Sequence, residues 1–113
     1  MNAHGFPKGE RLKKRSEFLS LSNRGRKIHA EHFVILYGEP ITSSIRIGIT
    51  VSRKVGNAVV RNRCKRMIRE FYRLNKYLFI KADYNIIAKP GAARMVFPDF
   101  VRELTSALQR LGK

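Results

Sequence analysis

The sequence predicts an α+β fold, a single-domain α/β sandwich in which an about four-stranded sheet packs with three helices in the order α-β-β(-β)-α-β-α. Three observations predict it. A chain of 113 residues with 43% hydrophobic residues has the size and composition of one domain that folds without disulfides or metals. Apolar and polar residues alternate over residues 45–52, whereas apolar residues recur at helical spacing over residues 57–74. Elements in this order pack as helices against one sheet.

The beginning of the chain predicts an irregular arm followed by a short helix. Glycine and proline interrupt residues 1–12, which we expect to form an irregular N-terminal arm. After it, Ser16 offers an N-cap and Gly25 a stop, with apolar residues between them. A helix is therefore expected from Ser16 to Gly25.

Two strands are expected in the middle of the chain. Residues 32–37 are β-branched and aromatic, and a turn-forming segment follows them. In the second strand, residues 45–52, large apolar side chains point to one face, while the other face is polar and small. Gly48 weakens this strand, so we expect a backbone or a ligand to approach closely there.

A helix capped by Asn57 and ending near Leu74 carries most of the functional information. One stripe of this helix is apolar and typical of a core-facing surface. It comprises Val60, Cys64, Met67, Ile68 and Phe71. The opposite stripe is polar and cationic and comprises Asn62, Lys65, Arg66, Arg69, Arg73 and Lys76, with Arg61 and Arg63 on its borders.

The last third predicts one more strand and a final helix. Residues 83–89 form the strand, and a glycine- and proline-containing loop follows it. The final helix is expected to begin near Pro98 and to stop at Gly112.

The charge balance predicts a polyanionic partner. The net charge of +16 causes self-repulsion that a polyanion would relieve. Like charges four residues apart, as in Lys65 with Arg69, destabilise a helix by roughly 0.2–0.5 kcal/mol per pair, which disfavours a merely solvated face. The planar guanidinium group of arginine binds phosphates through two hydrogen bonds and stacks on bases. The arginines therefore favour structured nucleic acid over an anionic membrane. No helix-turn-helix precedes Asn57, so RNA is favoured over DNA.

Side chains for chemistry are sparse. The eight acidic residues are scattered singly, which argues against a metal-dependent nuclease. His29 and His32 are expected at the surface or an edge, and Cys64 is expected to be a small buried hydrophobe. A single cysteine and no secretory h-region indicate a reducing, cytoplasmic setting. The longest apolar run, residues 33–37, is too short for a bilayer. The chain is predicted to bind rather than to catalyse, with no membrane and no small-molecule substrate.

Three segments resemble one family. Residues 11–18 (RLKKRSEF), 46–73 (RIGITVSRKVGNAVVRNRCKRMIREFYR) and 83–89 (DYNIIAK) closely resemble the protein component of bacterial ribonuclease P. The pattern K-x-G-N-A-V-x-R-N-R-x-K-R inside the second segment is that family's signature. The resemblance implies a ribosomal protein S5 domain 2-like fold. It also implies a subunit that binds the catalytic RNA, which with Mg²⁺ at its active site removes the 5′ leader from precursor tRNA.

The resemblance also implies roles for individual residues. The RNA-binding residues would be Arg61, Asn62, Arg63, Lys65, Arg66, Arg69, Arg73, Lys54, Asn57, Arg53 and Arg11. The leader cleft would contain Phe18, Phe33 and Gly48. Ser22 stands where many members carry a second aromatic residue, so stacking in the cleft would rest mainly on Phe18. A ribosomal-type RNA-binding protein without a nuclease and a self-sufficient nuclease are the alternatives, and the signature favours the ribonuclease P subunit.

Overall fold

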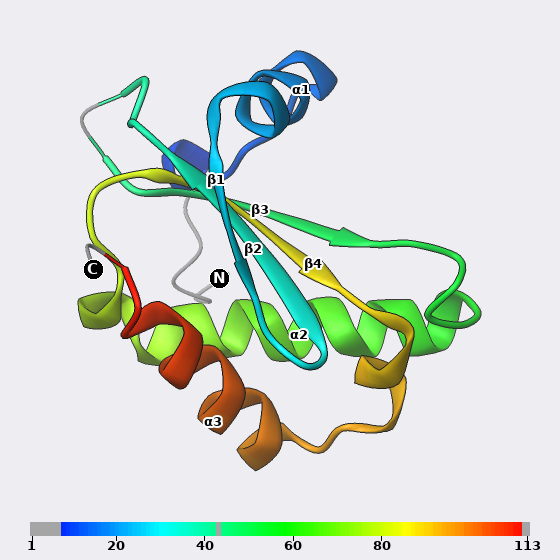
Figure 1. Ribbon diagram of the computed structural model, residues 1–113. Coiled ribbons are helices and arrows are strands. Elements are labelled where there is room, and N and C mark those ends of the chain that lie inside the picture. The colour runs from blue at the N-terminus through cyan, green and yellow to red at the C-terminus, as the bar shows by residue number, and fades with distance from the viewer. Residues whose placement is uncertain (1–7, 43, 112–113) are drawn as a thin grey trace.

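The computed structural model describes residues 8–42 and 44–111, which form three layers (Figure 1). The middle layer is a sheet with the strand order β1-β2-β4-β3. Helix α1 lies over one face, and α2 and α3 cover the other (Figure 1). The bounds are α1 Arg15–Arg24, β1 Arg26–His29, β2 Phe33–Gly38, β3 Arg46–Val51, α2 Ala58–Leu74, β4 Asp83–Ala88 and α3 Phe97–Leu108. The predicted α+β class, four-stranded sheet and three helices are confirmed for the described residues.

The sheet is mixed, and its centre is β4. Strand β2 pairs antiparallel with β1 and with β4, whereas β3 pairs parallel with β4. Since β3 and β4 are parallel neighbours, the chain must cross over between them, and α2 makes this crossover. Asn85 of β4 lies opposite Leu36 of β2 and Gly48 of β3. These three positions form the middle of the sheet face under α1.

The arm differs from the expectation where the structure describes it. Residues 1–7 lie outside the described part, but Lys8–Glu10 form a 3-10 helix. Arg11 then makes a parallel bridge with Ile47, and the Leu12 N–H donates to the Ile47 carbonyl at 3.0 Å. The prediction of an irregular segment is therefore wrong for residues 8–12, because β3 is an edge strand with free backbone groups that this segment pairs.

The first helix begins earlier than predicted. Ser16 lies inside α1, and Lys14 is the N-cap residue. The Glu17 carboxylate accepts hydrogen bonds from the N–H groups of Lys13 at 2.9 Å and Lys14 at 3.0 Å, which starts the helix earlier. At the other end, the Gly25 N–H donates to the Leu21 carbonyl at 2.8 Å, which confirms the predicted stop.

The final segments follow the prediction with small shifts. The loop after β4 contains a 3-10 helix, Pro90–Arg94. Helix α3 ends at Leu108, and the predicted stop Gly112 lies outside the described residues. The apolar side chains of α3, with Phe100 and Leu104 fully buried, pack toward the sheet face that α2 also covers.

An ion network fixes α1 above the sheet. Arg46 donates through Nε and Nη2 to the two oxygens of Asp83 at 3.0 and 2.9 Å, and through Nη1 to Glu17 Oε2 at 2.7 Å. Arg24, at the other end of α1, donates to Asp83 Oδ2 at 2.9 Å. Asp83 is completely buried. The network therefore holds both ends of α1 at a fixed height over β3 and β4.

The network perturbs the acidity of both carboxyl groups. Backbone N–H donors of Lys14 and Lys13, helped by Arg46, lower the pKa of Glu17 to about 2. Burial alone would raise the pKa of Asp83, but hydrogen bonds and charges from Arg46 and Arg24 bring it below its ordinary value. Both groups are therefore ionised near neutral pH.

Candidate nucleic-acid interface

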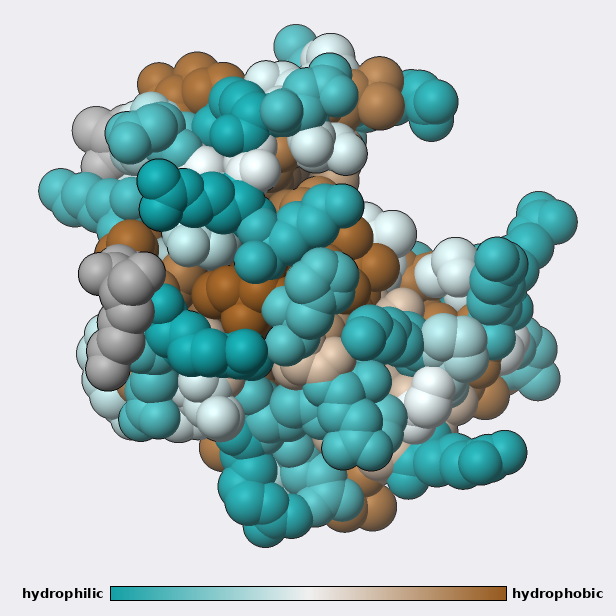
Figure 2. Space-filling view, viewed as in Figure 1, coloured by the Kyte–Doolittle hydropathy of each residue, from teal (hydrophilic) through white to brown (hydrophobic). Residues whose placement is uncertain are grey.

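A groove lies between α1 and the exposed face of the sheet. It has a volume of about 510 Å³. Figure 2 shows it as a notch at the right of the molecule, between α1 and the turn after β3, with apolar atoms along its inner wall. Its lining residues come from α1, β2, β3, β4 and α2, and are Arg15, Phe18, Leu19, Ser22, Leu36, Ile49, Thr50, Val51, Lys65, Asn85 and Ile87.

The predicted pair Phe18 and Gly48 meets in this groove. A Cβ atom on Gly48 would lie 2.4 Å from Phe18 Cε1 and 2.7 Å from Cζ. Only glycine lets the aromatic ring lie directly on β3. A close approach at Gly48 is therefore confirmed, but the approaching group is the Phe18 side chain and not the backbone or ligand that the sequence predicts. Phe18 remains half-buried, with part of its ring available to the groove.

Phe33 lies elsewhere, and its predicted place in the leader cleft is wrong. It is 0% exposed and packs edge-to-face on Phe100 of α3 with ring centroids 5.0 Å apart. Since side chains alternate along a strand, Phe33 points to the α2–α3 side, while its neighbours on β2, including Leu36, supply the groove face. Phe33 is a core residue.

Cationic side chains of α2 lie at the mouth of the groove. A second hollow of about 230 Å³ adjoins Phe18 and is lined by Arg11, Leu12, Lys13, Phe18, Ile47, Ile49, Lys65 and Arg69. Lys65 and Phe18 line both hollows. The aromatic groove and the cationic helix are therefore one continuous surface, although Phe18 and Lys65 are far apart in the sequence.

The predicted cationic stripe is not uniform. Asn62, Arg66, Arg69 and Arg73 are exposed, whereas Arg61, Arg63 and Lys65 are half-buried. Arg63 donates to the carbonyls of Ala93 at 3.3 Å and Met95 at 2.6 Å, so it joins α2 to the segment before α3. Arg73 is paired with Glu70, which raises the pKa of the guanidinium. Lys76 lies beyond α2 and pairs with Glu10 at 3.1 Å.

The turn before α2 carries the other predicted cations. Arg53 and Lys54 are exposed there, between β3 and the helix. Asn57 is the N-cap, and its Oδ1 accepts a hydrogen bond from the Val60 N–H at 3.0 Å, as the sequence predicts. Capping occupies the side-chain oxygen of Asn57, so a phosphate at this helix end would meet backbone N–H groups instead.

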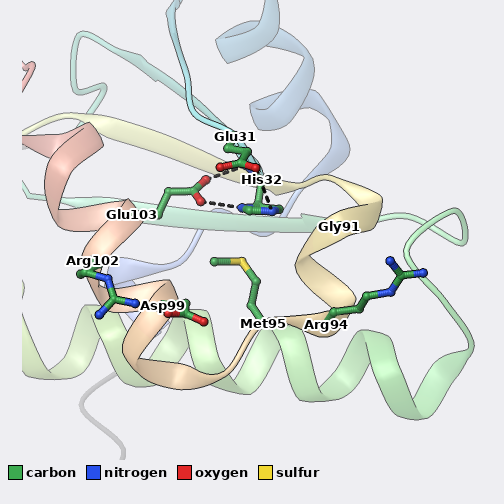
Figure 3. A pocket seen from close by; sticks show the side chains of 8 residues that line it. All are labelled: Glu31, His32, Gly91, Arg94, Met95, Asp99, Arg102 and Glu103. Atoms are coloured by element: carbon green, nitrogen blue, oxygen red, sulfur yellow. Dashed lines mark hydrogen bonds and ion pairs between the residues drawn. The ribbon is translucent and has the colours of Figure 1, made fainter.

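A cluster that sequence reasoning missed lies at the far end of the sheet (Figure 3). His32 donates its backbone N–H to Glu103 Oε2 at 2.6 Å, and its Nδ1 lies 2.7 Å from Glu103 Oε1. Glu31 Oε2 lies 3.8 Å from His32 Nε2. The expectation that acidic residues stay apart is therefore wrong here, because folding brings α3 to the β1–β2 loop. Both carboxylate oxygens of Glu103 contact His32, so this pair links the β1–β2 loop to α3.

Cys64 is completely buried on the core side of α2, as predicted. Burial raises the pKa of its thiol, although the nearby Arg63 opposes this shift. A protonated, enclosed thiol cannot act as a nucleophile. Among residues 8–42 and 44–111, no helix has the length and apolar character required to cross a bilayer.

Comparison with known proteins identifies the family. The model of the Ribonuclease P family matches residues 6–112. The chain belongs to the ribonuclease P protein family. The ribonuclease P protein component of Geotalea uraniireducens is 55% identical over 113 residues and is covered completely, as is this chain. That of Geobacter sp. strain M21 is 50% identical over 113 residues, which are 100% of this chain and 97% of the relative.

Solved structures of the family have the same fold. The RNase P protein from Thermotoga maritima matches with a TM-score of 0.83 at 33% identity, covering 92% of this chain and 99% of that one. The Staphylococcus aureus RNase P protein matches with a TM-score of 0.83 at 32% identity, over 88% and 93% of the two chains. The chain is thus a protein component of ribonuclease P, a ribonucleoprotein endoribonuclease, with a role in processing the tRNA 5′ leader together with an RNA subunit. This sets aside the alternative of a ribosomal-type protein without a nuclease.

Proposed function

We propose that α2 binds the catalytic RNA while the groove under α1 holds the single-stranded 5′ leader of precursor tRNA. The observation that carries this proposal is the continuity of the two surfaces, because Lys65 and Phe18 line both hollows. One protein could then hold the RNA subunit on one side and the substrate on the other. Precursor tRNA is made in the cytoplasm of bacteria, where we expect the protein to act.

The groove suits an extended strand of RNA. Its inner wall combines an aromatic ring with aliphatic side chains, and unpaired bases stack on such surfaces. Arg15 and Lys65 at its rim are placed to neutralise phosphates. Ser22 lines the same groove without adding an aromatic ring, so Phe18 supplies the only one there among the described residues.

The described surface does not suit a metal ion at the proposed interface. The side chains around the smaller hollow are apolar or cationic and offer no carboxylate. Mg²⁺ prefers oxygen ligands and keeps several of its waters. We therefore infer that Mg²⁺ is held by the RNA and substrate phosphates, while Lys65, Arg69 and their neighbours supply positive charge that reduces the Mg²⁺ concentration needed.

Cleavage at low Mg²⁺ tests the proposal. A bacterial ribonuclease P RNA should cleave precursor tRNA poorly at a few millimolar Mg²⁺, and addition of the protein should restore cleavage. Protein alone should cleave nothing. The proposal is wrong if the protein leaves cleavage unchanged with an RNA that is active at high Mg²⁺, or if the protein cleaves without RNA.

Two phenylalanines distinguish the groove from the core. Phe18→Leu should weaken holoenzyme binding of leader-bearing tRNA by roughly tenfold, because stacking on an aromatic ring contributes about 1–3 kcal/mol per base. Phe33→Leu should instead lower the free energy of unfolding by about 1 kcal/mol and leave leader affinity unchanged. Binding assays and thermal melts on both variants check this. An equal effect of the two variants on leader affinity would contradict the placement of Phe33.

A further inference from the structure

A buried asparagine on the floor of the groove has an unused hydrogen-bond donor. Asn85 lies in the middle of β4 and is 6% exposed. Thr50 Oγ1 donates a hydrogen bond of 2.9 Å to Asn85 Oδ1. Both side chains line the groove, from neighbouring strands. No sequence pattern singles out this asparagine, because it stands between Tyr84 and Ile86 in a largely apolar strand.

The amide nitrogen of Asn85 opens on the groove. Within the described ranges, 8–42 and 44–111, Nδ2 donates no hydrogen bond. Because Nδ2 is not one of the fully enclosed polar atoms without a partner, it is accessible from the groove that Asn85 lines. Buried polar groups in native proteins are nearly always hydrogen-bonded. A nine-tenths buried side chain with an open donor therefore points to a partner from outside the chain.

A hydrogen bond from Thr50 holds the side chain of Asn85. The Thr50 hydroxyl donates to Oδ1, so the group left for the groove is the NH₂. The floor of the groove therefore presents a donor.

The surroundings favour a base over a phosphate as the partner. Asn85 lies opposite Leu36 on one side and Gly48 on the other, and the Phe18 ring lies on Gly48. Neighbouring strands are about 4.8 Å apart, so ring and amide are within reach of one flat base. Leu36 and Ile87 make this part of the groove apolar, which suits a base and not a charged phosphate. Arg15 and Lys65 offer phosphates a better place at the rim.

We propose that Asn85, oriented by Thr50, reads one nucleobase of the leader by donating a hydrogen bond from Nδ2 to an acceptor atom on the base edge. The acceptor is a ring nitrogen or carbonyl oxygen, such as N7 of a purine, O2 of a pyrimidine or N3 of cytosine. The base lies beside Phe18. This proposal rests on the proposed function, because it requires the leader to lie in the groove.

The test is a coupling experiment with the complete holoenzyme. Precursor tRNAs that carry one abasic site, moved along the leader, are bound to the wild type and to the Asn85→Leu variant. At one leader position, loss of the base should weaken binding by the wild type about 3- to 10-fold more than it weakens binding by the variant, which keeps the stacking on Phe18. At all other positions the two enzymes should lose affinity equally. Equal losses at every position would overturn the proposal.

Further variants keep the test decisive. Asn23→Leu makes the same chemical change at an exposed position of α1 that lines neither hollow, and it should behave as the wild type. Thr50→Val keeps the shape but removes the orienting hydroxyl, so it should reduce the effect at the same leader position. Modified bases at that position test the acceptor in the wild type. If the acceptor is a ring nitrogen, a deaza base that lacks this nitrogen should reproduce the loss of affinity. If the acceptor is a carbonyl oxygen, a base that lacks this oxygen should reproduce it. If neither substitution changes affinity, the proposal is wrong even if Asn85→Leu does not fold.

Failure of this inference is distinguishable from failure of the proposed function. The wild-type holoenzyme is compared on tRNA with and without a leader. No gain of affinity from the leader would refute the groove as its binding place, and the reading by Asn85 with it. A clear gain from the leader without coupling to Asn85 would refute only the reading by Asn85.

Discussion

Replacing Arg46 by alanine should lower the free energy of unfolding by about 3 kcal/mol. The variant leaves Asp83 as a fully buried carboxylate that has lost two of its three side-chain hydrogen bonds. Breaking a buried ion pair by removal of one partner costs about 3–5 kcal/mol, and the lower figure applies because Arg24 still donates to Asp83. Urea unfolding at pH 7 measures the change. Arg102→Ala is a matched control, since Arg102 is paired with Asp99 on the surface with its side chain 75% exposed, and its loss should cost less than about 1 kcal/mol.

The effect of Arg46→Ala should depend on pH. The folded protein holds the pKa of Glu17 at about 2 and that of Asp83 below its ordinary value. A carboxyl group with a lowered folded pKa adds stability above its unfolded pKa, near 4, and loses it as the pH falls toward the folded value. The stability difference between wild type and variant should therefore shrink between about pH 4 and pH 2. A difference that stays constant over this range would mean that packing of the Arg46 stem, and not its charge, is what the variant loses.

The elements with strong local patterns were predictable from the sequence. Strand β3 alternates cleanly, and α2 has a capping asparagine, one apolar stripe and one cationic stripe. These patterns are set by residues within a few positions of one another, and local physics determines them. The family signature lies in the same region, which is why residues of α2 could be proposed from the sequence to bind RNA.

What the sequence could not predict depends on contacts between distant segments. Phe33 lies in a run in which residues at both odd and even positions are hydrophobic. The alternation of side chains therefore could not show which residues face the core and which face the groove. Pairing of β2 with β4 and packing of α3 decide it. The tether of His32 to Glu103 and the pairing of Arg46 with Asp83 join residues 71 and 37 positions apart. No local pattern encodes such partners.

Removal of three cations from α2 should reduce the affinity for the catalytic RNA by roughly 100-fold at physiological salt. Lys65, Arg66 and Arg69 suit this test because their side chains have no ion-pair or hydrogen-bond partner among the residues that the structure describes. Arg73, in contrast, is ion-paired with Glu70, and Arg63 donates to backbone carbonyls. The counterions released at each phosphate contact increase the affinity for RNA by roughly a factor of four to five at about 0.15 M salt. Replacement of all three by alanine should leave the thermal melt nearly unchanged.

The dependence of affinity on salt separates specific contacts from bulk charge. With about six phosphate contacts, log affinity should fall with log salt at a slope near −4 for the wild type and near −2 for the triple variant, by the single-strand rule. A control triple variant, Arg26→Ala, Lys27→Ala and Arg102→Ala, lowers the net charge from +16 by the same three units at exposed positions away from α2. It should keep a slope near −4. If both triple variants lose affinity and slope equally, the RNA responds to the total charge of the protein, and α2 is not the surface that holds it.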